Sequence, residues 1–210
     1  MTHVTYPSLD DSLARKIARL SVTQYEAMID RGIIPEGEPI ELLNGLLVFK
    51  DRSASGGRAM TVGPEHQLVL NKLSRLAPQV ERRGCYLALQ SPIRIPPTSE
   101  PEPDASIVLG KPEDYAKRHP TADEVFAVIE VADSSLLYDR NAKLRVYAGA
   151  GINQYVIVNL VDHQVEVYFS PLKSETRFKG RAIRTGAESV ALALGLGRKH
   201  LTIRAKDLLP

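Results

Sequence analysis

The segment Val125–Ala132 constrains the fold most strongly, because seven of its eight residues are apolar. A strand with one face in solvent would alternate apolar and polar residues, so this composition predicts a strand that is covered on both faces. Glu130 is the single exception. An ionised carboxylate in such a strand costs free energy unless a metal, a cation or hydrogen bonds compensate it. Other groups in the chain must therefore accompany Glu130.

Two other segments offer suitable charged groups. Asp104 follows a proline-rich loop at 96–103 and opens an apolar run at 105–109, which predicts a second strand. Lys143 lies in a predicted helix over 139–149, where about 100° per residue places it on the same inward side as Asp139 and Tyr147. We therefore expect Asp104, Glu130 and Lys143 to form the centre of a metal-dependent site.

This set of residues suits hydrolysis of a phosphodiester. Two carboxylates at the ends of neighbouring strands can share Mg²⁺ or Mn²⁺, ions that prefer oxygen ligands. A water made more acidic by the metal can attack the phosphorus atom, and a nearby ammonium can orient that water or balance the growing charge. Structural alternatives stay open: a cap at Asp104, a buried ion pair between Glu130 and Lys143, a helix cap at Asp139, and a core position for Tyr147.

The order of these motifs resembles the restriction-endonuclease-like nucleases with the PD-(D/E)XK signature. It is most similar to the putative restriction endonuclease domain family within that superfamily. The matching motifs are Glu41-Leu42-Leu43-Asn44-Gly45, Pro103-Asp104, Glu130-Val131 and Asp139…Lys143…Tyr147. Ala132 occupies the position of the signature lysine, and the resemblance implies that Lys143 on the following helix replaces it.

The resemblance also implies the fold, the activity and further site residues. It implies an α/β fold, with a restriction-endonuclease-like mixed central sheet flanked by helices and an additional β-rich C-terminal region. The implied activity is that of a Mg²⁺-dependent endonuclease acting on nucleic acid, with DNA as the expected substrate and a homodimer expected by analogy. Glu41 would be a ligand or contact a metal-bound water, with a cross-strand role in a hairpin as the alternative, and the Val131 carbonyl would be a ligand. The rival prediction is a catalytically inactive module that binds nucleic acid or assembles with proteins.

Length and composition set broader limits. At 210 residues we expect a single domain over 1–210, with an N-terminal extension at 1–20 and a basic β-rich tail at 171–210. The tail carries nine Lys/Arg against three Asp/Glu, which suits either phosphate contact or solvated edge strands. Cys85 is the only cysteine, so an internal disulfide is excluded. We find neither a secretion signal nor an apolar run long enough to span a membrane, so we expect a cytoplasmic protein.

The remaining patterns predict individual elements. Thr23 and Glu26 have the spacing of a capping box, and Asn44-Gly45 predicts a tight hairpin over 40–49. Residues 53–58 are expected to form a mobile loop. A helix should start at Pro64, and His66 in its first turn is either structural or a ligand or substrate contact. Further strands are expected at 85–90, 93–95, 154–159, 164–169, 176–183, 189–192 and 201–203, with a last helical turn before Leu209.

Overall fold

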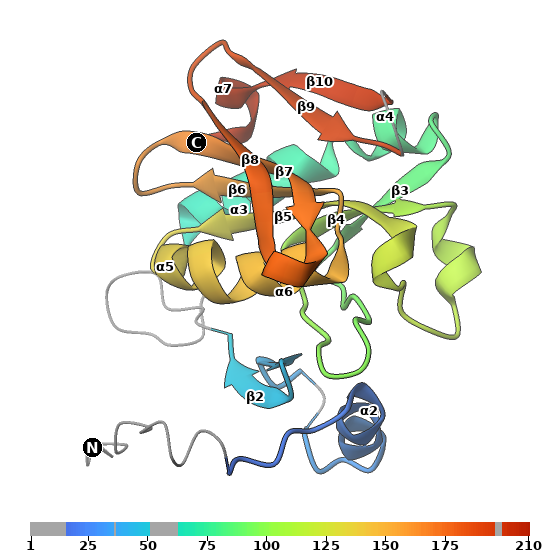
Figure 1. Ribbon diagram of the computed structural model, residues 1–210. Coiled ribbons are helices and arrows are strands. Elements are labelled where there is room, and N and C mark those ends of the chain that lie inside the picture. Colours follow the sequence, from blue (N-terminus) through green and yellow to red (C-terminus); the bar gives the residue numbers. More distant parts are fainter. Residues whose placement is uncertain (1–15, 36, 51–62, 196–198) are drawn as a thin grey trace.

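The computed structural model describes residues 16–35, 37–50, 63–195 and 199–210 (Figure 1). The loop expected at 53–58 and most of the N-terminal extension lie outside these ranges. Residues 17–20, which are described, form no helix. No helix in the described parts of the chain is long and apolar enough to cross a membrane.

A six-stranded mixed sheet with the order β3-β4-β5-β6-β7-β8 forms the centre of the molecule. Its strands are β3 (Cys85–Leu89), β4 (Ala105–Leu109), β5 (Val125–Ala132), β6 (Gln154–Asn159), β7 (Gln164–Leu172) and β8 (Arg177–Arg184). Only β5 and β6 are parallel, and every other neighbouring pair is antiparallel. All eight residues of β5 are buried, which confirms the strand predicted from its apolar composition. The predicted fold class is therefore confirmed.

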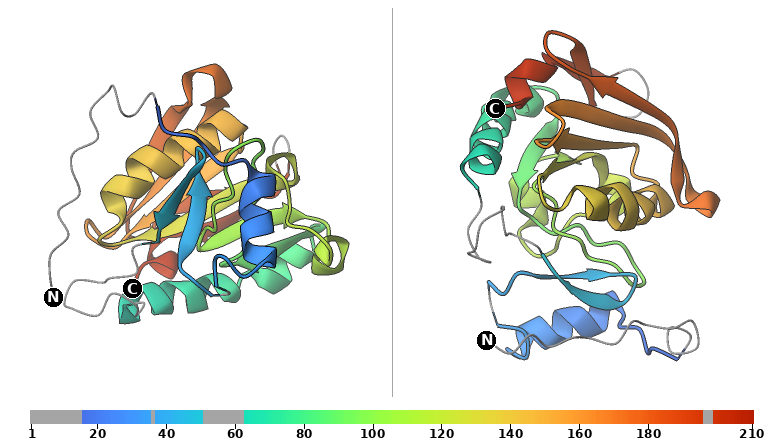
Figure 2. Two further views of the ribbon diagram at one scale, coloured as in Figure 1. Left: turned by 90° about the horizontal axis from the view of Figure 1, so that it is seen from below. Right: turned by 90° about the vertical axis from the view of Figure 1, so that its left-hand side faces the viewer.

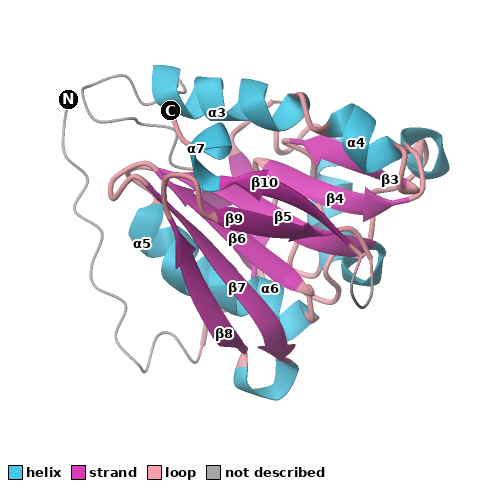
Figure 3. Ribbon diagram, turned by 90° about the horizontal axis from the view of Figure 1, so that it is seen from above, coloured by secondary structure: helices cyan, strands magenta, loops and turns pink. Residues whose placement is uncertain are grey.

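Helices cover both faces of this sheet, as Figure 3 shows from above. On one face lie α3 (Pro64–Ser74), α4 (Ala77–Glu81) and α7 (Ala205–Leu208), together with the hairpin β9 (Ser189–Ala193) and β10 (His200–Arg204). On the other face lie α5 (Leu136–Tyr138), η3 (Asp139–Lys143) and α6 (Leu144–Ala150). Because β5 alternates between the two faces, Ile129 and Val131 join the first core while Ala132 joins the second. Glu130 therefore points toward the α5–α6 side.

The predicted helix over 139–149 starts earlier than expected and contains a π-helical turn. It begins with α5 at Leu136, continues through η3 as a π-helix, and ends where Gly151 adopts the left-handed conformation with φ 81°. Its inward side carries Asp139, Lys143 and Tyr147 as predicted. Ala148 is also buried, and α6 contacts both β7 and β8 of the sheet. A π turn re-aims side chains relative to an α-helix, and such turns occur frequently at functional sites.

A small unit beside the main sheet carries Glu41. It consists of α2 (Val22–Asp30) and the antiparallel hairpin of β1 (Ile40–Leu43) and β2 (Leu46–Phe49), seen apart from the sheet in the right-hand view of Figure 2. Asn44 and Gly45 both have positive φ, as a tight turn of this type requires, so the predicted hairpin is confirmed. The N-cap of α2 is Ser21 with Gln24 as its capping-box partner, so the predicted Thr23–Glu26 box is wrong.

The connections carry two short 3₁₀ turns, η1 (Pro112–Tyr115) and η2 (Ala122–Glu124), and a third, η4 (Lys173–Glu175), joins β7 to β8. The strand expected at 93–95 is wrong: Arg94 and Ile95 make only isolated bridges, to Thr121 and Ser99. In the C-terminal region, β8 completes the central sheet, whereas β9 and β10 pair only with each other. Cys85 is buried, as expected for a core cysteine.

Candidate active site

Asp104 and Glu130 meet where β4 and β5 stop pairing. The last register pair of these antiparallel strands is Ala105 with Ile129, so the next residue on each strand lies just beyond the ladder. The backbone N–H of Asp104 donates to Glu130 Oε2 at 3.3 Å, and the backbone N–H of Val131 donates to Asp104 Oδ2 at 2.8 Å. Each carboxylate therefore lies beside the backbone of the other strand, and the two acids share one edge of the sheet.

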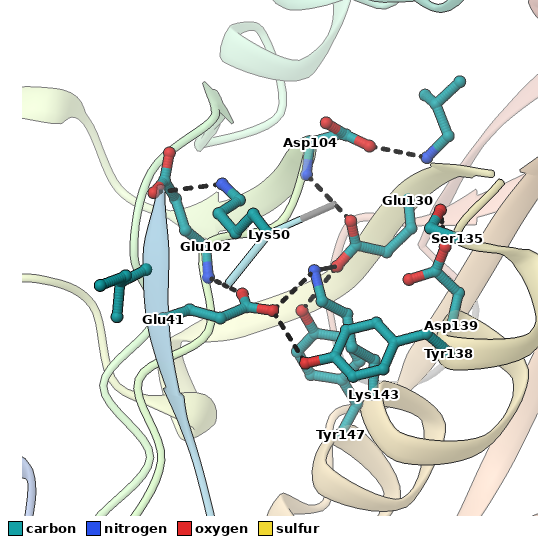
Figure 4. Close-up of polar contacts among 12 residues, drawn as sticks. Glu41, Lys50, Glu102, Asp104, Glu130, Ser135, Tyr138, Asp139, Lys143 and Tyr147 are labelled. Carbon is teal, nitrogen blue, oxygen red and sulfur yellow. Dashed lines mark hydrogen bonds and ion pairs between the residues drawn. The ribbon is translucent and has the colours of Figure 1, made fainter. Parts of the chain in front are cut away.

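Lys143 reaches this edge from η3, as the close-up in Figure 4 shows. Its ammonium lies 2.8 Å from Glu130 Oε1, and the Tyr147 hydroxyl donates to the same oxygen at 2.9 Å. Ala132, two residues after Glu130 on β5, is fully buried in the apolar core beneath α6. The ammonium group beside Glu130 therefore comes from the helix and not from β5.

Glu41 points from the hairpin into the same site rather than across to β2. Its Oε1 lies 3.5 Å from the Lys143 ammonium and accepts a hydrogen bond from the Tyr138 hydroxyl at 3.2 Å. Its Oε2 accepts from the backbone N–H of Glu102 at 3.1 Å. Glu41 is only 1% exposed. Its cross-strand neighbour on β2 is the apolar Val48, which offers its carboxylate no polar partner. The site is therefore assembled from the hairpin, two strands and a helix.

These side chains line a pocket of about 380 Å³. The first turn of α3 closes one side of it with His66, whose Nε2 lies 3.1 Å from Asp104 Oδ2. Lys50 and Tyr138 also line the pocket, and the Lys50 ammonium lies 3.1 Å from Glu102 Oε2. The sequence analysis missed Lys50 and Tyr138, and it left His66 open between a structural role and a ligand or substrate contact. The position of His66 at the start of an apolar helical pattern was the one sequence signal for a site role. That pattern does not identify the carboxylate that His66 contacts.

Seven Asp and Glu side chains line this pocket, together with two lysines, Lys50 and Lys143. Four of the seven, Glu41, Asp104, Glu130 and Asp139, interact electrostatically with the Lys143 ammonium. Burial raises the pKa of Glu130 above its ordinary value, and Lys143 opposes that rise. Burial likewise raises the pKa of Asp139 to about 6. Burial would also raise the pKa of Asp104, but hydrogen bonds from His66 and the Val131 N–H hold it below its usual range. The acidic side chains of the pocket outnumber its basic ones, and a bound cation would favour the ionised forms of the acids whose pKa burial raises.

The donor set suits a hard divalent cation. Carboxylate oxygens are the ligands that Mg²⁺ prefers, and this ion keeps several waters and needs only one or two carboxylates from the protein. Among the described residues, no group of three or more His, Cys, Asp and Glu side chains is already arranged to hold an ion. One reason is that Lys143 contacts both Glu130 and Glu41. The residues fit a partly hydrated ion rather than a closed protein cage.

Comparison with known proteins identifies the family and a similar fold. The family model Uma2, described as putative restriction endonuclease, matches residues 22–201. No curated protein matches the chain. The fold is similar to that of a crystal structure described as a putative nuclease belonging to DUF820 from Anabaena variabilis ATCC 29413. The TM-score is 0.61 at 15% identity, covering 90% of this chain and 97% of the other. The chain therefore belongs to the Uma2 family, a family of putative restriction endonucleases.

Proposed function

We propose that this protein is a divalent-metal-dependent endonuclease that hydrolyses phosphodiester bonds of nucleic acid, with DNA as the first substrate to test. The observation that carries the proposal is the contact of Asp104, Glu130 and Lys143 within one pocket. Glu130 accepts hydrogen bonds from both the Asp104 N–H and the Lys143 ammonium. Membership of the Uma2 family supports the same activity.

Asp104 and Glu130 would hold Mg²⁺ or Mn²⁺, with Glu41 as a further ligand or as a contact to a bound water. Val131 would add its carbonyl oxygen. Its N–H points to Asp104 instead of to a neighbouring strand, and in a β-strand the N–H and C=O of one residue lie on the same edge. When bound, the ion would supply an acidified water and neutralise charge on the phosphoryl oxygens.

Lys143 would stabilise the negative charge that develops on the phosphoryl oxygens, because its ammonium is held at the pocket floor by Glu130 and Glu41. Tyr147 donates to the Glu130 oxygen that Lys143 also contacts, and so fixes the orientation of that carboxylate. Tyr138 does the same for Glu41. These hydrogen bonds hold the charged groups in place before the substrate enters.

The test is incubation of the purified protein with duplex and single-stranded DNA in Mg²⁺ or Mn²⁺. The variants are Asp104→Asn and Lys143→Ala, and Glu113→Gln on the exposed turn η1 is the control. We expect cleavage by the wild type and the control, and a loss of at least ~100-fold in both site variants. Cleavage that persists in Asp104→Asn would contradict the proposed site. Binding without cleavage by the wild type would instead favour an inactive nucleic-acid-binding module.

A further inference from the structure

His66 is the pocket residue whose contact most directly constrains Asp104. It lies in the first turn of α3, on the opposite side of the sheet edge from Lys143, and 19% of its side chain is exposed. Its Nε2 lies 3.1 Å from Asp104 Oδ2. The two residues are 38 positions apart in the chain, so the contact depends on how α3 packs against the sheet.

The chemistry of this contact fixes the direction of the hydrogen bond. An ionised carboxylate only accepts hydrogen bonds, so the imidazole must present Nε2–H to Asp104. The other ring nitrogen, Nδ1, is buried and has no hydrogen-bond partner among the described residues. The ring is therefore held to the site by its contact with Asp104, not by a network on its far side.

The Asp104 carboxylate accepts two hydrogen bonds from described residues, and both fall on the same oxygen. Oδ2 accepts from His66 and from the Val131 N–H, whereas no contact joins Oδ1 to another described residue. Two donors that converge on one oxygen from different elements, α3 and β5, restrict rotation of the carboxylate about its χ2 angle. Oδ1 is then the oxygen left for a ligand.

We propose that His66 is a positioning residue, which holds the Asp104 carboxylate so that Oδ1 faces the bound divalent ion. The inference rests on the proposed metal-dependent function. Hydrogen-bond donors behind a metal-binding carboxylate orient it, and their loss reduces metal affinity by ~10- to 100-fold. A purely structural role for His66 in starting α3 would change the stability of the helix without changing the orientation of Asp104.

Three variants separate these roles. His66→Leu removes the donor and keeps most of the volume. His66→Gln keeps an N–H donor that can reach Asp104, and should restore much of the lost function. Gln67→Ala is the matched control, because Gln67 is exposed in the same turn and, among the described residues, its side chain hydrogen-bonds only to Asn71. Thermal unfolding of all three variants identifies any that fail to fold.

The first measurement is Mn²⁺ binding by calorimetry. We expect His66→Leu to raise the dissociation constant by ~10- to 100-fold, and His66→Gln and Gln67→Ala to stay within about threefold of the wild type. Wild-type affinity in a folded His66→Leu variant would overturn the inference while leaving the proposed function intact.

The second measurement does not depend on a metal. Crystal structures of the metal-free variants should show the Asp104 carboxylate in one orientation in wild type and His66→Gln, and rotated or in several orientations in His66→Leu. An unchanged carboxylate in His66→Leu would overturn the inference even if the wild type bound no metal. A wild type without metal affinity, by contrast, would refute the proposed function.

Discussion

Substitution of Lys143 by methionine tests how strongly the buried charges depend on one another. Lys143 is 5% exposed and Glu130 is 3% exposed, and the two groups are 2.8 Å apart. Methionine keeps much of the aliphatic packing but removes the ammonium. Breaking a buried ion pair on one side typically destabilises a protein by ~3–5 kcal/mol, because an uncompensated charge remains.

The pH dependence gives an independent magnitude. Without Lys143, Glu130 is expected to take up a proton in the folded state, whereas in the unfolded chain it ionises near its ordinary pKa. At pH 7.5, about three units above that pKa, holding the proton costs about 4 kcal/mol at ~1.4 kcal/mol per unit. This figure is an upper bound on the deficit relative to wild type, because burial already raises the pKa of Glu130 when Lys143 is present. A folded-state pKa above the unfolded value stabilises the fold at low pH, and that contribution is lost as pH rises. The deficit of Lys143→Met should therefore shrink as pH falls from 7.5 toward 5.

Urea unfolding followed by circular dichroism measures both quantities. The double variant Lys143→Met/Glu130→Gln should recover at least half of the lost free energy of unfolding, because it removes the stranded carboxyl along with its partner. A single variant within about 1 kcal/mol of the wild type at pH 7.5, or a deficit that does not change with pH, would refute the reasoning.

Three further predictions follow from other parts of the molecule. Burial raises the pKa of Glu100 to about 7, so its contribution to stability is present at low pH and lost as pH rises through 7. Glu100→Gln should therefore be about 3 kcal/mol more stable than wild type at pH 8, whereas Glu113→Gln at an exposed position should not change the stability. Equal stability of Glu100→Gln and wild type across pH 5–8 would contradict this prediction. A Cβ at Gly45 would lie 2.5 Å from Arg19 Cβ, whereas a Cβ at Gly32, which also has positive φ, would meet nothing within 4 Å. Gly45→Ala should therefore lower the melting temperature clearly more than Gly32→Ala. Similar losses in the two variants would show that backbone strain, and not the contact with Arg19, sets the melting temperature. Mn²⁺ at 100 times its dissociation constant should raise the free energy of unfolding by about 2.7 kcal/mol, and Asp104→Asn should abolish most of that gain; a calorimetric scan that shows the same rise in the variant would place the ion elsewhere.

Much of the fold could be predicted because the patterns are local. The apolar β5, the Asn-Gly hairpin and the strands β6 and β7 each follow from a few adjacent residues. The α2 cap was mispredicted because Ser21-x-x-Gln24 and Thr23-x-x-Glu26 both have capping-box spacing, and the sequence does not say which serine or threonine leaves the helical conformation. The predicted strand at 93–95 failed because a short apolar run needs a partner strand, and only isolated bridges are present.

The candidate site was predictable in part. The proximity of Asp104, Glu130 and Lys143 followed from an isolated charge in a buried strand and from helical spacing. The contact between His66 and Asp104 was not predictable, because it depends on the packing of α3 against the end of the sheet. The Tyr138 contact with Glu41 depends on how the hairpin docks, which no periodicity encodes.

The hairpin that supplies Glu41 rests on a small core of its own. Four buried residues form that core, Val22, Tyr25, Ile34 and Leu42, and backbone bonds from Gly45 and Glu100 tie the unit to the loop before β4. Units with so few apolar contacts open at a lower free energy than the sheet they pack against. Warming the protein should therefore separate Glu41 from Asp104 and Glu130 while the sheet is still folded. Catalytic activity should then be lost at a lower temperature than the fold.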